Sequence, residues 1–263
     1  MSEALETIQQ TLPDLDAWGA RTSVPYRPGP GSALAEDDLG WPPMPLSQCA
    51  IAALASCRDH LQAVRVHIDA QNVFPFATRT LLRTAVLAGA QAVWMLAPDS
   101  ALTRQQRGRT VAAEVYRRHG EFLSDLQSLN GARHAGTDTV ATLVAERLAE
   151  LAEQRAAAGE RDQWQATKII ESAATATFGD TNLVEARVEW RAGSGAAHGL
   201  IWSVFGTAAL RRSAVHDESA DGLTAFAAGG SLDAVANTYM LAYGLARKGW
   251  LMMDDLGSAL PSA

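Results

Sequence analysis

Apolar residues at helical spacing follow one another through most of the chain after residue 46, and this pattern strongly limits the possible folds. In the first such segment, five apolar residues recur at intervals of three, four and seven: Ile51, Leu54, Leu61, Val64 and Ile68. That spacing places side chains on one face of an α-helix. No segment alternates apolar and polar residues as a half-buried strand does. The sequence therefore predicts an all-α fold.

Breaks in the periodicity divide this part of the chain into about seven helices, which we expect to pack as a multi-helix bundle. Gly, Pro, Asn and Asp residues at the breaks supply turns and helix caps. The segment 76–96 is apolar over most of its surface, so we expect it to be the buried central helix. The expected helices cover residues 47–71, 76–96, 101–130, 137–158, 161–176, 181–212 and 232–255.

The first 46 residues differ in composition, because prolines and glycines are frequent between residues 19 and 46. A proline inside a helix removes a hydrogen bond and clashes with the preceding turn. We therefore expect a short helix over residues 3–12, ended before Pro13, and then an extended Pro-rich N-terminal arm. The expected organisation is an N-terminal helix and Pro/Gly-rich arm at 1–46, a single helical domain at 47–257 and a loose tail at 258–263.

Charge and composition argue against several classes of function. With 22 basic and 29 acidic residues, the net charge of −7 argues against a protein that coats nucleic acid without sequence preference. The two cysteines, Cys49 and Cys57, offer no disulfide framework or zinc site. The N-terminus lacks the apolar core of a signal peptide, and every apolar stretch is too short to cross a membrane. We therefore expect a cytoplasmic bacterial protein without membrane contact.

No sequence pattern indicates a cofactor or a metal. Glycine-rich phosphate loops and the Gly-x-Ser-x-Gly turn of serine hydrolases are absent. His60 and His67 are seven residues apart on an expected helix, but no acidic residue is placed to complete a tetrahedral site with them. We therefore expect neither a cofactor nor a bound metal.

A reactive combination of side chains occurs between residues 189 and 199. If this segment is helical, Arg191, Ser194 and His198 occupy positions i, i+3 and i+7 and share one face. A fixed cation, a hydroxyl and a group that titrates near neutral pH suit the binding of a phosphodiester and the movement of its protons. Arg211 and His216 form a poorer pair, because an offset of five turns two helical side chains about 140° apart.

Each of these residues also has a purely structural interpretation. A glycine destabilises a helix by about 0.5–1 kcal/mol relative to alanine, so Gly193, Gly195 and Gly199 need a reason. They permit either the close packing of a neighbouring helix or the approach of a phosphate to the motif. Arg191 could equally form an ion pair with a nearby glutamate, and His198 could be a core histidine.

The pattern Arg-x-x-Ser-x-x-x-His-Gly, with Trp190 before it and Trp202 in the apolar run after it, resembles the signature of the HEPN superfamily of helical domains. Residues 81–98 are similar to a helix of a poorly characterised bacterial HEPN-like group, although that group often has a glutamate where Leu87 stands here. Several HEPN members are metal-independent ribonucleases or toxins, and others are inactive binding modules.

The resemblance implies a metal-independent endoribonuclease that acts on RNA phosphodiesters, as a toxin or defence effector. His198 would be the general base or acid, Arg191 would neutralise the scissile phosphate, and Ser194 would orient the phosphate or the imidazole. HEPN ribonucleases are typically dimers with the cleft at the interface, so we expect a homodimer, and an antitoxin protein is a further expected partner. The alternative is a non-catalytic helical binding or regulatory protein that retains the Arg/His pair.

A basic stretch offers a second set of candidate residues. Five arginines are opposed by a single glutamate between residues 103 and 118, and Arg104, Arg107 and Arg118 share a helix face. Because the guanidinium fork fits phosphate oxygens, these three are candidate contacts to RNA or a nucleotide. A solvated helix surface is the structural alternative. The tryptophans Trp190 and Trp202, like the others, favour core packing over base stacking.

Overall fold

The computed structural model describes residues 3–130, 135–204, 209–212 and 226–259. The chain divides into two compact units, each assembled from three separate stretches of sequence. The single helical domain expected at 47–257 stays a prediction. The first unit comprises Met1–Tyr26, Ile51–Trp94 and Ala166–Leu251, and the second comprises Arg27–Ala50, Met95–Gln165 and Met252–Ala263.

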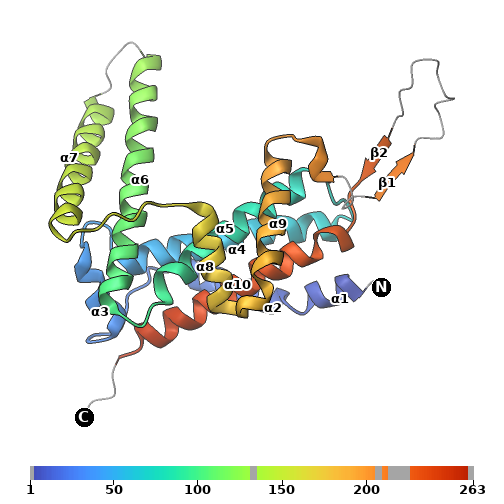
Figure 1. The fold of residues 1–263 in the computed structure, drawn as a ribbon, viewed down its shortest axis with the longest axis horizontal. Coiled ribbons are helices and arrows are strands. Elements are labelled where there is room, and N and C mark those ends of the chain that lie inside the picture. Colours follow the sequence, from blue (N-terminus) through green and yellow to red (C-terminus); the bar gives the residue numbers. More distant parts are fainter. Residues whose placement is uncertain (1–2, 131–134, 205–208, 213–225, 260–263) are drawn as a thin grey trace. The chain divides into compact units, whose positions relative to one another are not determined.

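Helices make up most of the described chain, and Figure 1 shows them coloured along the sequence. The all-α expectation is confirmed in this broad sense, but the described residues form ten α-helices rather than about seven. The α-helices are α1 (Glu3–Gln9), α2 (Leu12–Thr22), α3 (Ala33–Asp37), α4 (Leu46–Asp69), α5 (Ala77–Leu96), α6 (Ala101–Asn130), α7 (Ala135–Ala157), α8 (Ala166–Phe178), α9 (Leu183–Ala197) and α10 (Asp233–Gly257). Three short 3-10 helices are η1 (Asp38–Gly40), η2 (Asp180–Asn182) and η3 (Ile201–Val204).

The prediction of an extended Pro-rich N-terminal arm is wrong. The short helix expected over residues 3–12 is present as α1, but α2, α3 and η1 occupy parts of the segment that we expected to be extended. Pro13 lies in the first turn of α2, where a proline N–H would have no helical partner. α3 follows Ser32, whose side chain accepts a hydrogen bond from the N–H of Ala35 at 3.2 Å. Prolines are compatible with such short helices because they stand at helix starts and in the connections.

The expected helix over 181–212 is also corrected, since α9 ends much earlier. Gly199 has a φ of +68°, a left-handed conformation that stops the helix. The N–H of Leu200 donates to the carbonyl of Gly195 at 2.9 Å, and the N–H of Gly199 donates to the carbonyl of Ala196 at 3.0 Å. These two bonds satisfy carbonyls at the helix end. Gly199 therefore terminates α9, which explains this glycine without a neighbouring helix or a ligand.

A small antiparallel sheet departs from the helical architecture within the first unit. β1 (Ala209–Arg212) pairs with β2 (Phe226–Gly229), with Ala209 opposite Gly229 and Arg212 opposite Phe226. Such short strands are set by pairing with one another rather than by a recognisable alternation of residues. These two strands were therefore not predictable from the sequence.

The core of the first unit is built largely from α4, α5 and α10. Leu61, Val86 and Leu245 are fully buried. Gly89 permits close packing, because a Cβ atom at this position would lie 3.1 Å from the Cβ of Leu245. The first unit thus presents α9 on a closely packed helical base.

The second unit has its own core around α6 and α7, which pack against each other. Arg109 is buried and binds the carboxylate of Glu160, and its guanidinium also donates to the carbonyl of Gly40 at 3.2 Å. This ion pair connects α6 with η1 and with the segment after α7. The apolar residues of the core are Trp41, Ala112, Tyr116, Leu123, Val144 and Leu151.

Candidate functional site

The inner face of α9 is held against α5 by close contacts. A Cβ atom at Gly193 would lie 2.7 Å from the Cβ of Arg83, so only a glycine permits this approach. One turn earlier, Trp190 is buried, and the guanidinium carbon of Arg83 lies 4.3 Å from the centre of its ring. This geometry is a cation–π contact. Gly193 therefore has the packing role that the sequence left open, and the opposite side of α9 faces outward.

Arg191, Ser194 and His198 follow one another along this outward side. Arg191 and His198 are exposed and Ser194 is half-buried. His198 is the residue directly after the helix, and its N–H still donates to the carbonyl of Ser194 at 3.2 Å, so it continues the helical register. Seven residues advance a helix by about 10 Å, a separation that an extended arginine side chain and one phosphate can bridge.

Two structural alternatives for the motif do not hold in the described part of the chain. Arg191 has no ion pair or hydrogen bond to a described residue, although Glu185 and Glu189 are close in sequence. Glu189 instead accepts a hydrogen bond from the hydroxyl of Thr238 on α10. His198 is exposed rather than a core histidine, and likewise has no described side-chain partner. Both side chains are therefore available to a ligand.

The side chain of Trp202 packs on α9 at Gly195, a contact that we did not predict from the sequence. The side chain of this η3 residue is half exposed, at 50%. Its ring packs on Gly195, where an added Cβ would be 2.6 Å from Cζ2 of the indole. Position 195 neighbours both Arg191 and His198 on the helix surface, at offsets of four and three. Trp202 thus adds an aromatic surface to this side of α9. Gly195, on which the ring packs, was the residue in the sequence that could have indicated this contact.

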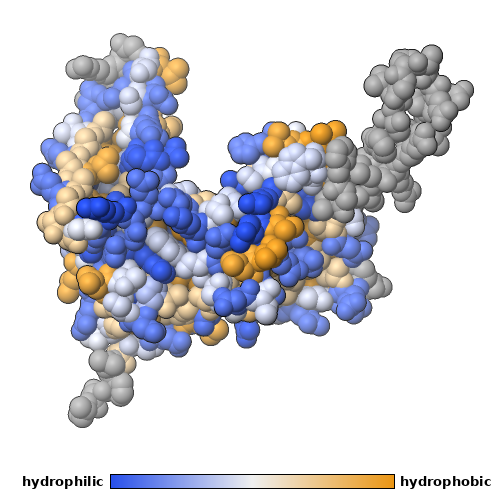
Figure 2. Space-filling model, in the orientation of Figure 1, coloured by the Kyte–Doolittle hydropathy of each residue, from blue (hydrophilic) through white to orange (hydrophobic). Residues whose placement is uncertain are grey.

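Apolar side chains continue this face in both directions. Val184 and Val188, about two turns and one turn before Arg191, are 65% and 56% exposed. Leu200 and Ile201 are also exposed, after the end of α9. Figure 2 shows apolar residues over α9 and η3 on the visible side of the molecule. An exposed apolar surface around a polar centre is typical of an interaction site.

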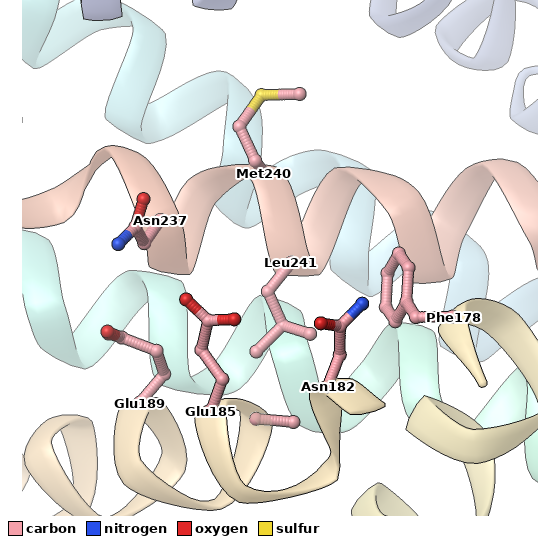
Figure 3. Close-up of a pocket in the computed structure, with 8 residues that line it drawn as sticks. Phe178, Asn182, Glu185, Glu189, Asn237, Met240 and Leu241 are labelled. Carbon is pink, nitrogen blue, oxygen red and sulfur yellow. The ribbon is translucent and has the colours of Figure 1, made fainter. Parts of the chain in front are cut away.

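A separate pocket of about 210 Å³ lies between α9 and α10, and we call it the α9–α10 pocket. In Figure 3, Asn182 and Glu185 rise from the α9 side toward Leu241 of α10, Phe178 closes one end, and Met240 points away. The side chains that line it combine carboxylates, amides and apolar groups: Phe178, Asn182, Glu185, Ala186, Glu189, Asn237, Met240 and Leu241. None of them belongs to the predicted Arg/His motif.

The predicted basic residues of α6 do not form one open surface. Arg104 is buried, and its Nε lies 2.5 Å from Oδ2 of Asp37, so this guanidinium stabilises the second unit. Arg107 is half-buried, and burial lowers the pKa of its guanidinium. Arg118 is exposed but pairs with Glu114 at 2.9 Å and with Glu121 at 3.4 Å. Of the three, Arg104 has the least access to a phosphate.

Arg118 does border a second hollow, of about 550 Å³, in the second unit. Arg117 and Arg155 line it as well, together with Trp164. Arg117 is paired with Glu114 through two hydrogen bonds of 2.8 Å from one guanidinium nitrogen, so much of the positive charge is compensated. The hollow therefore has less attraction for phosphate than its arginines alone suggest.

His60 and His67 have hydrogen-bond partners within the described part of the chain. His60 binds the carbonyl of Ser56 through Nδ1 at 2.7 Å, and Nδ1 of His67 lies 3.2 Å from the hydroxyl of Thr78. Across the described ranges, no three His, Cys, Asp or Glu residues are grouped to hold a metal. Of the second pair, Arg211 lies in β1 and His216 lies outside the described residues. Among the described helices, none combines the length and the apolar character that crossing a membrane requires.

Comparisons with protein-family models, with curated proteins and with solved structures gave no match for this chain.

Proposed function

We propose that the chain is a HEPN-like, metal-independent endoribonuclease that acts as a toxin or defence effector, with Arg191, Ser194 and His198 as its site. One observation carries the proposal: Arg191 and His198 are exposed on one side of α9, and neither has a described ion pair or hydrogen bond from its side chain. The half-exposed ring of Trp202 packs on Gly195, which lies between Arg191 and His198 in the sequence, and offers a surface on which an RNA base can stack.

The proposed reaction uses the 2′-hydroxyl of the RNA as the nucleophile. His198 removes its proton, the oxygen bonds to phosphorus, and the bond from phosphorus to the 5′ oxygen breaks. The leaving oxygen takes a proton from an acid, so the products are a 2′,3′-cyclic phosphate and a 5′-hydroxyl. Arg191 neutralises the negative charge that grows on the phosphate oxygens, and Ser194 orients the phosphate or the imidazole.

A second copy of the chain supplies the missing acid in this proposal. One histidine removes a proton on one side of the phosphorus, but the leaving oxygen needs a proton on the other side. The exposed Val184 and Val188 would pack against the same residues of the second copy around a two-fold axis. That arrangement brings two copies of His198 to one phosphate. An antitoxin protein would bind to the same exposed apolar face, which includes Val184 and Val188.

The test is cleavage of a labelled single-stranded RNA in the presence of EDTA. The wild-type protein should cut RNA and leave DNA of the same sequence intact, because DNA lacks the 2′-hydroxyl. His198→Ala should lower the rate about 10²-fold or more, the usual contribution of a general acid or base, and Arg191→Ala should act in the same direction. Two exposed residues of the same types serve as controls, since Arg161→Ala and His119→Ala should cut as the wild type does.

The dimer has an independent test by light scattering at micromolar concentration. Val188→Glu places a charge on the exposed face and should give a folded monomer without ribonuclease activity. Val140→Glu, at an exposed valine of the second unit, is the matched control and should leave the dimer intact. A monomeric wild-type protein that still cleaves RNA would refute the shared site.

A non-catalytic RNA-binding or regulatory protein is the second candidate. It is favoured by the position of Arg191 and His198 on an open helix face, since neither lines the α9–α10 pocket or the hollow of the second unit. Such a protein would retard labelled RNA in a gel and leave it uncut. If the wild-type protein binds RNA without cutting it and Arg191→Ala no longer binds, Arg191 belongs to an RNA-binding site that is not catalytic.

A further inference from the structure

We infer that the α9–α10 pocket binds a small organic cation, namely an ammonium or guanidinium group on a short apolar stem. This site is distinct from the proposed RNA site. Glu189 of the pocket and Arg191 are two positions apart on α9, so their side chains diverge by about 160°. The inference therefore does not depend on whether the chain cleaves RNA.

The shape of the pocket is set by its apolar residues. The ring of Phe178 rests on Gly244 of α10, where an added Cβ atom would lie 2.6 Å from Cζ of the ring. Figure 3 shows the ring at one end of the pocket. Ala186 and Leu241 add further apolar surface. The volume of about 210 Å³ is below the range of roughly 300–1,000 Å³ that is usual for drug-sized ligands, so the occupant must be small.

The polar residues of the pocket select the charge of the occupant. Its lining holds two carboxylates, Glu185 and Glu189, and no lysine, arginine or histidine. Glu185 has no hydrogen bond or ion pair with a described residue. Glu189 accepts one hydrogen bond from Thr238, while the charge of buried Arg79 lies close enough to interact with it. The negative charge of Glu185 is therefore not balanced by a described hydrogen-bond donor or cation of the chain.

Two side-chain amides complete the recognition. Asn182 precedes the first residue of α9, yet its side chain makes no capping hydrogen bond and is directed into the pocket instead. Asn237 lies across the pocket on α10. Their carbonyl oxygens can accept hydrogen bonds from an ammonium or guanidinium group, and the face of an aromatic ring such as Phe178 attracts the same charge.

A hydrated metal ion fits these residues less well. The described chain holds no group of three or more His, Cys, Asp or Glu side chains that could ligate a metal. Calcium takes six to eight oxygen ligands, and magnesium keeps most of its waters. The apolar surfaces of Phe178, Ala186 and Leu241 would gain nothing from such an ion, whereas they can cover an alkyl stem.

The experiment is calorimetric titration of the full chain with n-butylammonium, n-butylguanidinium, n-butanol and butyrate. The two cations should give saturable binding that weakens as salt is added, and the neutral and anionic analogues should give none at the same concentrations. Glu185→Gln keeps the shape of the pocket and removes its uncompensated charge. It should weaken the binding of both cations about tenfold, the loss expected for one charge-assisted hydrogen bond.

Two further variants make the result specific to the pocket. Gly244→Ala should displace the ring of Phe178 and also weaken cation binding, with helix content checked by circular dichroism. Glu153→Gln, at an exposed glutamate of α7, is the matched control and should bind as the wild type does. Equal binding of butanol and butylammonium, wild-type affinity in Glu185→Gln, or binding of calcium without binding of the organic cations would each overturn the inference.

Discussion

The buried pair of Asp37 and Arg104 gives a prediction whose size can be worked out from the structure. The carboxylate is 0% exposed and the guanidinium 6%, and Nε lies 2.5 Å from Oδ2. Arg104 also donates to the carbonyls of Pro98 and Asp99, at 2.9 Å each. Burial raises the pKa of Asp37 above 3.8, and the hydrogen bond and charge of Arg104 oppose this only in part. The arginine is therefore what makes a charged carboxylate tolerable at this position.

Arg104→Met removes that compensation, and Asp37 can then stay buried only by holding a proton. Keeping a carboxyl group protonated at pH 7, when the unfolded chain releases its proton near pH 3.8, costs 1.36 × (7 − 3.8), or about 4 kcal/mol. The same step costs about 2 kcal/mol at pH 5. The value at pH 7 agrees with the roughly 3–5 kcal/mol usually lost when one partner of a buried ion pair is removed.

The sign of the pH dependence follows from where the proton is bound. In the variant, folded Asp37 keeps a proton that the unfolded chain loses above pH 3.8. Because the folded state then binds more protons, stability falls as the pH rises through the window from 3.8 to 7. The difference in unfolding free energy between wild type and Arg104→Met should therefore increase by up to about 1.4 kcal/mol for each pH unit.

Denaturant unfolding of both proteins at pH 5, 6 and 7, followed by circular dichroism, measures this difference. The double variant Asp37→Leu with Arg104→Met is the control, because it removes the buried carboxylate together with its partner. Its stability should return to within about 2 kcal/mol of the wild type, with no added pH dependence. An equal loss for Arg104→Met at pH 5 and pH 7, or a double variant no more stable than the single one, would refute the reasoning.

Three further predictions concern the first unit and the two cysteines. Gly193→Ala should lower the unfolding free energy by about 1–3 kcal/mol in denaturant titrations because its Cβ would meet that of Arg83 at 2.7 Å, whereas Gly136→Ala, with open space around it, should not. Burial raises the pKa of the Cys49 and Cys57 thiols to about 12, so neither should react with Ellman's reagent at pH 8 until the protein is unfolded. Trp202→Ala should weaken RNA binding about tenfold in fluorescence titrations, and Trp202→Phe should retain most of the affinity, if a base stacks on this ring.

The sequence alone determined where the long helices lie. Expected and observed bounds agree within a few residues for five of them, at 47–71, 76–96, 101–130, 137–158 and 232–255, because the apolar spacing, caps and breaks that define a helix are local. The wrong predictions concerned individual prolines and glycines at or between helix ends. The frequent prolines between residues 19 and 46 led us to expect an extended arm, and Gly199, which ends α9, was interpreted as permitting either close packing or the approach of a phosphate.

The motif on α9 was predictable for the same reason, since three residues on one helix are related by a fixed rotation. What each side chain meets was not predictable. Arg104 is buried because Asp37, sixty-seven positions away in sequence, lies beside it, and this contact removes it from the expected basic surface. Trp202 is exposed because its ring packs on Gly195 rather than in the core.

The α9–α10 pocket depended entirely on the tertiary structure. Its residues come from the end of α8, from η2 and α9, and from α10, and no spacing within any of these segments relates Phe178 to Glu185 or Leu241. Helix formation follows from interactions over three or four residues, so it can be inferred from sequence. Burial, ion pairing and the shape of a pocket follow from which helix surfaces pack together, and that is decided only when the whole chain minimises its exposed apolar surface.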